Sequence, residues 1–469
     1  MRFQTSFGLA LLGFCTAVGC GDDTAPAAPP GNGGNVGNAG SPEPGSSGAS
    51  SSEAGQRGEA TGGGGMDPGQ AGAGPIAGAN DGGAPPFVIC NDGKGTTVSG
   101  RVLAPNGELP VSGAQVYVSS TTADPPPAGA GCFRCASALS GEPAALATTD
   151  SEGRFQLLDV PSGEQLQLVV QTGKWQRTTT LEGLVACQDN PVEEDDTRLP
   201  SKSSEGNLPS IALISGGEDT LECLLRKLGI DDSEFGYASS IERVQLYSAE
   251  GGMTALSAPK EGNGTLAAAT DLWGSAENLS AFDLVILGSE LDENAADKPE
   301  AALAALHDYV TKGGRVLLQH FQSYFVKAGP ADISGLVSFA AQPDLAEPSA
   351  IQVDVTSPRG QAFADWLSVV EATDPQGKLS LSQGQNTMQS VQAPALRLLY
   401  GAAPATVQAF SIDLPYGADK ASCGRLTATD ILTAAGDTID DFPTGCSSTD
   451  LSAQEKALAY LLFDAGACL

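Results

Sequence analysis

The chain has 469 residues, with 24 Lys and Arg against 56 Asp and Glu, a formal net charge of −32. No cluster of Lys and Arg is present, which excludes nucleic acid as an expected partner, because such binding needs a basic surface to replace condensed counterions. The simplest consequence of the acidity is solubility. Beyond the first 20 residues no apolar run is long enough to cross a bilayer, so we expect a water-soluble polypeptide.

The N-terminus has the pattern of an export signal. Met1 and Arg2 supply a short positive segment, residues 7–14 are apolar, and Ala17-Val18-Gly19-Cys20 follows. These four residues resemble a bacterial lipobox, which implies removal of residues 1–19 as a signal peptide and lipid attachment to Cys20. The expected location is the bacterial cell envelope, with the membrane contacted through that lipid. The alternative is an ordinary signal peptide cut near the same place.

Residues 20–87 are dominated by Gly, Ala, Ser and Pro, as in the run of residues 61–65. Too few large apolar side chains are present to offset chain entropy, so this composition predicts a disordered tether. The glycines have no strict third-residue period, which excludes collagen.

Ten cysteines are present, of which Cys15 lies in the predicted signal and Cys20 is the predicted lipidation site. The remaining eight are an even number, which in an exported protein favours disulfides over reactive thiols or metal ligands. We expect four disulfides in a connectivity that spacing leaves open. The candidates are Cys90, Cys132, Cys135, Cys187, Cys223, Cys423, Cys446 and Cys468.

Residues 88–190 contain short alternating runs separated by turn residues, which predicts an antiparallel β-sandwich. The runs are residues 97–103, 111–118, 148–157 and 166–170. Their motifs, including Val98-Ser99-Gly100-Arg101-Val102 and Thr149-Asp150-Ser151-Glu152-Gly153-Arg154-Phe155, resemble carboxypeptidase regulatory-like domains. That resemblance implies a transthyretin-like sandwich without catalytic machinery, serving as a structural or adhesive module.

Three features of this region have competing interpretations. Cys132-Phe133-Arg134-Cys135 follows a proline run, so structural disulfides are favoured over zinc or redox chemistry. Asp150, Glu152 and Asp159 could line a Ca²⁺ site, although a solvated hairpin turn is the simpler interpretation. Trp175 could stack against a sugar or pack under the edge of the sheet.

Residues 191–207 are charged and polar without periodicity, which predicts a linker. Residues 208–469 then alternate apolar strands with helical stripes, which predicts a doubly wound α/β domain with a mostly parallel sheet. The expected strands are residues 211–214, 244–247, 282–287, 315–319, 407–412 and 424–429. Expected helices begin near Leu221 and Pro299, lie between Gly360 and Val370, and follow a capping box at Ser452.

Residues 282–288, the helix ending in Gly313-Gly314 and the strand ending in His320 resemble the core of the class I glutamine amidotransferase-like fold, especially its ThuA-like branch. An amidotransferase also needs a cysteine on a Gly-x-Cys-x-Gly turn, and no such motif is present. The resemblance therefore concerns the fold and not the activity.

Ligands of open α/β sheets bind at the carboxyl ends of the strands, where residues 215–219, 288–290 and 320–322 are expected. A catalytic arrangement there would use Ser289 as nucleophile, His320 as base and Asp430 to orient it. The second histidine, His307, is expected to flank the packed face of its helix.

Gly216-Gly217 could cradle an anion, but the two acidic residues that follow would repel phosphate. No cofactor or metal is expected. The sequence favours a non-catalytic binding or structural role through protein or glycan contacts. A hydrolase acting at the strand ends and a carbohydrate-binding surface protein are the alternatives.

Overall fold

The computed structural model describes residues 88, 90, 95–135, 139–162, 166–258, 260, 264–417, 420–433, 436–447 and 450–469. The predicted signal peptide, the lipidation site Cys20 and the predicted tether lie outside these residues. In the described part of the chain, no helix is long and apolar enough to cross a membrane.

The strands before residue 192 form two sheets, one with the order β4-β1-β7 and one with the order β3-β2-β5-β6. Inward-facing residues at alternate positions, including Val98, Val116, Phe155 and Leu168, belong to one hydrophobic cluster. These strands, here called the N-terminal strands, are β1 (Thr97–Arg101), β2 (Gln115–Ser119), β3 (Pro143–Thr148), β4 (Arg154–Leu157), β5 (Leu166–Thr172), β6 (Trp175–Leu181) and β7 (Asp189–Pro191).

The segment predicted as a linker packs against the N-terminal strands. It contains the helical turn α1 (Glu194–Thr197). Leu199 is fully buried, and its backbone N–H donates to the carbonyl of Leu103 at 2.9 Å. Asn207 pairs with Gln176 of β6. Although its composition is polar, the backbone of this segment finds hydrogen-bond partners on the neighbouring strands.

The largest sheet in the described residues has 13 strands, with the central order β11-β10-β8-β12-β13-β20-β19-β18-β15-β16. Pairing is parallel from β11 to β20 and antiparallel from β20 to β16, so the sheet is mixed and not mostly parallel as predicted. Its strands are β8 (Ile211–Ser215), β9 (Phe235–Tyr237), β10 (Val244–Ser248), β11 (Ala267–Ala268), β12 (Leu284–Leu287), β13 (Arg315–Gln319), β14 (Val337–Phe339), β15 (Ser349–Val353), β16 (Lys378–Leu381), β17 (Met388–Val391), β18 (Leu396–Ala402), β19 (Ala405–Leu414) and β20 (Gly424–Thr429).

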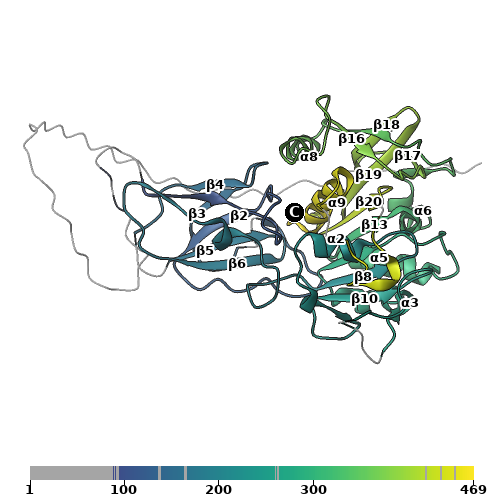
Figure 1. Ribbon diagram of the computed structural model, residues 1–469, viewed down its shortest axis with the longest axis horizontal. Coiled ribbons are helices and arrows are strands. Elements are labelled where there is room, and N and C mark those ends of the chain that lie inside the picture. Colours follow the sequence, from purple (N-terminus) through teal and green to yellow (C-terminus); the bar gives the residue numbers. More distant parts are fainter. Residues whose placement is uncertain are drawn as a thin grey trace, which may run out of the picture. The chain divides into compact units, whose positions relative to one another are not determined.

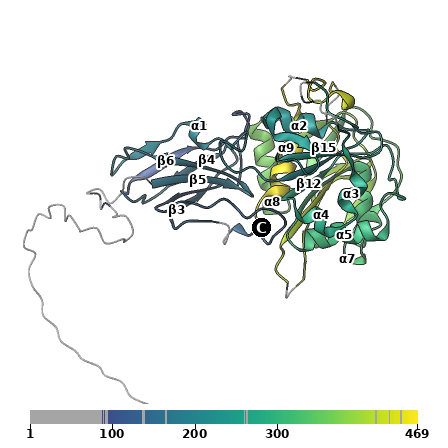
Figure 2. The same ribbon diagram turned by 90° about the horizontal axis from the view of Figure 1, so that it is seen from below.

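Helices cover both faces of this large sheet (Figures 1 and 2). Alternate residues of β8 face opposite sides of the sheet. Ile211 packs in one hydrophobic cluster with α2 and α9, and Ala212 packs in a second cluster with α3 and α5. The helices are α2 (Leu221–Lys227), α3 (Ala269–Trp273), α4 (Ala276–Ser280), α5 (Glu300–Thr311), α6 (Tyr324–Lys327), α7 (Ala331–Ser334), α8 (Pro358–Val369) and α9 (Ala453–Gly466). Short 3₁₀ segments are η2 (Asp232–Glu234), η3 (His320–Ser323) and η4 (Ile439–Asp441).

All eight candidate cysteines form disulfides, which confirms the disulfide prediction. The pairs are Cys90–Cys187, Cys132–Cys423, Cys135–Cys468 and Cys223–Cys446. The two cysteines of the CxxC sequence therefore bond to different partners. Both partners lie in the region of the large sheet, one just before β20 and one after α9, so two covalent links join this loop of the N-terminal part to the C-terminal region.

Candidate functional site

The carboxyl ends of β8, β12, β13 and β20 lie next to one another in the large sheet. We call the loops that follow these four strands the rim. They carry Glu218, Ser289, His320 and Asp430, and the last three are the residues that the sequence proposed as a catalytic set. Adjacent parallel strands end at the same edge, which is why segments far apart in the sequence meet here.

His320 directly follows β13 and has a backbone φ of 43°. A non-glycine residue with positive φ is sterically costly, and such residues concentrate at turns held by their surroundings. The sharp turn directs the imidazole into the protein, where His320 is only 2% exposed. Its ring lies against Phe321, with 3.8 Å between ring centroids. The strained strand-end turn of this rim is therefore occupied by a buried histidine.

Two groups meet the same nitrogen of His320. The Nδ1 atom lies 2.6 Å from Oε2 of Glu218 and 3.3 Å from Oγ of Ser289. The Ser289 hydroxyl also donates to Oε2 of Glu218 at 2.5 Å. A carboxylate only accepts hydrogen bonds, so Nδ1 carries a proton that it donates to Glu218. That nitrogen therefore has no lone pair with which to take the proton of Ser289.

This geometry differs from a serine-histidine-aspartate relay. In such a relay the hydroxyl and the carboxylate contact opposite nitrogens of the imidazole, so that one nitrogen is a base and the other is oriented. Here both contact Nδ1. Ser289 is also fully buried. The three side chains form one hydrogen-bonded network, in which Ser289 donates to Glu218.

Glu218 is the member of the cluster that reaches solvent, with 24% of its side chain exposed. Partial burial acts to raise the pKa of its carboxyl, but hydrogen bonds from His320 and Ser289, together with the imidazole charge, hold that pKa below its usual value. Glu218 is therefore ionised at neutral pH and can accept both hydrogen bonds.

Asp430, which the sequence assigned to orient His320, is bonded elsewhere. Its carboxylate accepts from the backbone N–H of Thr387 at 2.9 Å, from the Thr387 hydroxyl, and from the backbone N–H of Met388. Burial raises the pKa of Asp430, and the charge of His320 acts in the opposite direction. The carboxylate hydrogen-bonded to His320 is that of Glu218, because the loop after β8 reaches across the end of β12.

A second carboxylate lies beneath this network. Asp219 is buried and accepts from the backbone N–H of Thr220 at 2.8 Å, from the backbone N–H of Thr433 at 3.0 Å, and from the amide of Gln319. Gln319 in turn accepts from the backbone N–H of Ser289 at 3.3 Å. Burial raises the pKa of Asp219 to about 7, despite its hydrogen bonds. The sequence placed Asp219 among the residues expected at the strand ends but gave it no structural role.

Glycines allow the rim loops to pack closely over the network. A Cβ at Gly216 would lie 2.1 Å from the carbonyl oxygen of Ser289, and one at Gly252 would lie 2.0 Å from that of Ser215. Gly217 similarly meets Gly251, since a Cβ there would lie 2.9 Å from its Cα. The Gly216-Gly217 pair therefore serves close contact between loops, which explains the burial of Ser289 and His320.

A buried ion pair holds the loop after β12. Lys298 has no exposed side-chain surface and donates to Glu290 and to the carbonyl of Glu293 at 2.7 Å. Its ammonium lies 5.6 Å from the centre of the Trp273 ring. Burial raises the pKa of Glu290, whereas Lys298 lowers it. Because Glu290 follows Ser289 directly, this pair fixes the position of the Ser289 backbone.

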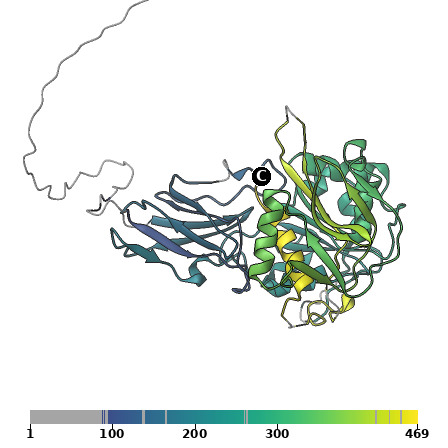
Figure 3. The same cartoon turned by 90° about the horizontal axis from the view of Figure 1, so that it is seen from above.

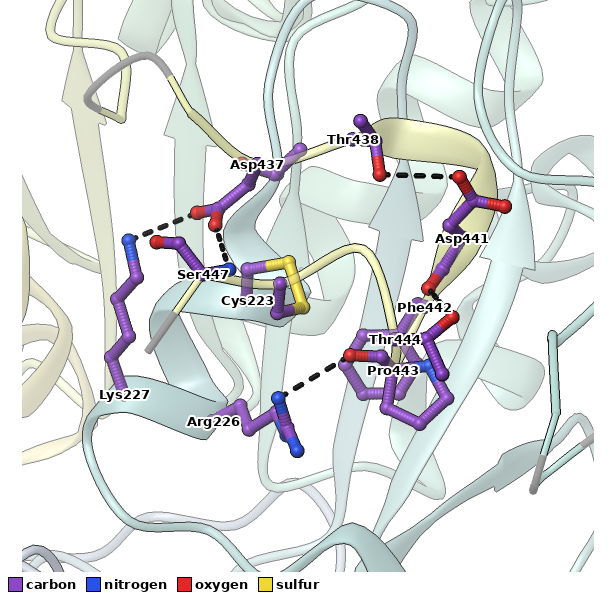
Figure 4. The surroundings of a disulfide bond; sticks show 12 residues. Cys223, Arg226, Lys227, Asp437, Thr438, Asp441, Phe442, Pro443, Thr444 and Ser447 are labelled. Carbon is purple, nitrogen blue, oxygen red and sulfur yellow. Dashed lines mark hydrogen bonds and ion pairs between the residues drawn. A yellow bond between two sulfur atoms is a disulfide. The ribbon is translucent and has the colours of Figure 1, made fainter. Parts of the chain in front are cut away.

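The disulfide Cys223–Cys446 ties α2 to the loop that follows β20 (Figure 4). Polar contacts surround it, because Lys227 donates to Asp437 at 2.9 Å and Arg226 donates to the carbonyl of Pro443 at 3.3 Å. Helix α2 follows Glu218 and Asp219 in the chain. The disulfide therefore braces the start of the rim network.

The other residues that the sequence singled out make structural contacts away from the rim. Trp175 is 2% exposed and packs against Phe463, so it offers no open face to a sugar. Asp150 accepts the backbone N–H groups of Glu152 and Arg154, which is the arrangement of a hairpin turn. His307 contacts Asp332 at 2.9 Å. No group of three or more His, Cys, Asp or Glu side chains suited to a metal occurs within the described residues.

No protein-family model and no curated protein sequence matches the chain. Among solved structures, it is similar to a ThuA-like protein from Bacteroides uniformis at 10% identity, over 55% of this chain and 90% of that one, with a TM-score of 0.29. A cohesin-X-dockerin complex from Acetivibrio cellulolyticus is similar at 17% identity, over 31% of this chain and 79% of that one, with a TM-score of 0.15. At these scores neither similarity supports a statement about activity.

Proposed function

We propose that this chain is an exported, lipid-anchored protein of the bacterial cell envelope with a non-catalytic binding or structural role. One observation carries the non-catalytic part. The Nδ1 atom of His320 donates its proton to Glu218 and is the nitrogen nearest to Ser289, so the histidine is not placed to activate the hydroxyl. The complete burial of Ser289 supports the same conclusion.

Export is supported by cysteine usage. The eight cysteines after Cys20 form four disulfides, and disulfides persist in oxidising compartments outside the cytosol. The lipobox-like sequence ending at Cys20 supports anchoring by lipid. Residues 20–87 would then act as a tether between the lipid and the folded part.

The arrangement of domains is also a proposal. Residues 88–190 would be a sandwich of the carboxypeptidase regulatory-like type, supported by two sheets that contribute inward residues to one core. Residues 208–469 would be a doubly wound domain of the amidotransferase-like type, supported by helices on both faces of its parallel half. Such modules present surfaces to ligands, and a protein or a glycan would be the partner.

Lipid anchoring is tested by metabolic labelling with radioactive palmitate in a bacterium that expresses the full chain. We expect label on the parent, no label on Cys20→Ser, and unchanged labelling of Cys15→Ser, a matched control that lies within the predicted signal. Equal labelling of all three, or none in the parent, would refute the anchor.

The catalytic alternative, a hydrolase at the rim, is tested with a panel of ester, amide and glycoside substrates. We expect no turnover above background by the parent protein. Turnover that is lost in both Ser289→Ala and His320→Gln, but kept in His307→Gln, would establish the hydrolase instead. His307 is the suitable control because it is the other histidine of the chain and lies away from the rim.

A further inference from the structure

A cavity of about 250 Å³ lies between residues 110–113 of the N-terminal part and helices α8 and α9. These helices lie side by side (Figure 3). Phe363 of α8 stacks on Tyr460 of α9. Protein interiors contain few voids larger than one water molecule. This volume would hold roughly eight waters at about 30 Å³ each, so it exceeds an ordinary packing defect.

The two walls of the cavity are held together. Nε1 of Trp366 in α8 donates to the carbonyl of Pro110 at 2.7 Å. Cys468, which lines the cavity, is bonded to Cys135 of the N-terminal part. The turn at Ser112 and Gly113 also lines the cavity, and Gly113 is exposed, so solvent has access there. The cavity is therefore preformed and open to solvent.

Aromatic rings form one wall. Tyr460 stacks on Phe363 with 4.3 Å between ring centroids and lies 5.4 Å from Trp366. Phe463, also in the wall, packs 5.5 Å from Trp175. These contacts hold the rings in fixed orientations. Fixed aromatic surfaces favour a flat apolar group in the occupant.

Two arginines also line the cavity, each paired with a carboxylate. Arg359 and Arg425 line the cavity with a single acidic residue, Asp464, which pairs with both. Arg425 is also engaged with Asp413 at 2.7 Å and is 5% exposed. Arg359 uses Nε and Nη2 for Asp464 and Ser411, while its Nη1 has no hydrogen-bond partner among the described residues. Its side chain is 25% exposed, which leaves it accessible to an anion.

We propose that this cavity binds a small carboxylate that carries a planar apolar group, such as an aromatic monocarboxylic acid. The carboxylate would accept from Arg359, which suits guanidinium geometry, and the ring would lie against Tyr460 and Phe463. The cavity shares no residue with the rim, so this site stands or falls independently of the proposed function.

The test is isothermal titration of the purified full chain, disulfides intact, with benzoate and with benzyl alcohol, its neutral counterpart. We expect benzoate to bind, and benzyl alcohol to bind at least about tenfold more weakly because it lacks the charge-assisted hydrogen bond. Absence of benzoate binding, equal affinity for the two compounds, or binding of glucose in place of benzoate would overturn the proposal.

Variants locate the site. Ala362→Trp should abolish benzoate binding by filling the cavity, whereas Gln361→Trp, on the exposed side of the same helix, should leave it unchanged. Arg359→Gln should weaken it about tenfold or more, with folding checked by the thermal midpoint. Asp464 keeps Arg425 as its counter-charge in that variant. Equal affinities of Ala362→Trp and Gln361→Trp would contradict this location, whether or not Arg359→Gln folds.

Discussion

Replacing Glu222 with glutamine should remove much of the pH dependence of this protein's stability. Glu222 lies in the first turn of α2 and is 1% exposed. Neither of its carboxyl oxygens has a hydrogen-bond partner in the part of the chain that the structure describes. Burial, reinforced by the neighbouring charges of Asp219 and Asp437, raises its pKa from 4.5 to about 8.

The direction of the effect follows from proton binding. Between pH 4.5 and 8 the folded state keeps a proton at Glu222 that the unfolded state releases, so stability falls as the pH rises. The contribution is fully present below about pH 4.5 and is lost as the pH passes the raised pKa. At about 1.4 kcal/mol per pKa unit, the rise in the pKa of Glu222 from 4.5 to about 8 corresponds to about 5 kcal/mol of unfolding free energy. Asp219, whose pKa burial raises to about 7, acts in the same direction and remains in the variant.

The assay is urea denaturation of the disulfide-intact protein, followed by tryptophan fluorescence between pH 4 and 9. We expect the free energy of unfolding of the parent to fall with pH, and that of Glu222→Gln to fall by several kcal/mol less. Glu300→Gln, an exposed replacement at the start of α5, should follow the parent. Parallel curves for the parent and Glu222→Gln would show that Glu222 does not cause the pH dependence of stability.

Two further predictions concern the rim and use the same denaturation assay at neutral pH. Gly216→Ala should lower the free energy of unfolding by more than about 2 kcal/mol, because the new Cβ would lie 2.1 Å from the carbonyl oxygen of Ser289. The control is Gly131→Ala, whose Cβ would meet nothing within 4 Å, and it should change that free energy by no more than about 0.5 kcal/mol. Equal effects would contradict close packing of the rim. Lys298→Met should cost about 3–5 kcal/mol by leaving Glu290 buried without its counter-charge, and adding Glu290→Gln should recover part of that loss. An unchanged free energy of unfolding in Lys298→Met would contradict a stabilising role for the ion pair.

The parallel half of the large sheet was well predicted from the sequence. The strands expected at residues 315–319 and 424–429 have the same bounds as β13 and β20. The capping box at Ser452 and Glu455 starts α9 as expected. These elements are specified locally, by continuous apolar runs and by residues that favour helix starts, so a short window of sequence suffices.

In the antiparallel half, the strand at residues 407–412 falls within β19, but the strands from β14 to β18 were not predicted, for a physical reason. Strands such as β14 and β17 are short and partly polar, and they gain stability from pairing with each other across some 50 residues. Disulfide pairing also joins distant parts of the sequence, since Cys135 and Cys468 are separated by 333 residues. Such contacts depend on the path of the whole chain and leave little local signal.

The sequence placed the rim loops together but not the contacts within them. Ser289 and His320 do meet, whereas the carboxylate on His320 comes from Glu218 and not from Asp430. Which carboxylate reaches His320 depends on the positive φ of His320 and on the glycines that let the loop after β8 cross Ser289. Backbone geometry of that kind has no periodic signature in the sequence.

We propose that Ser289 is a buried hydrogen-bond donor and not a nucleophile. The most direct measurement is mass spectrometry of the folded protein after exposure to a fluorophosphonate, a reagent that forms a covalent bond with activated serine hydroxyls. We expect no added mass on Ser289, with a known serine hydrolase labelled in parallel as a control. Stoichiometric labelling of Ser289 that disappears in His320→Gln would contradict this proposal.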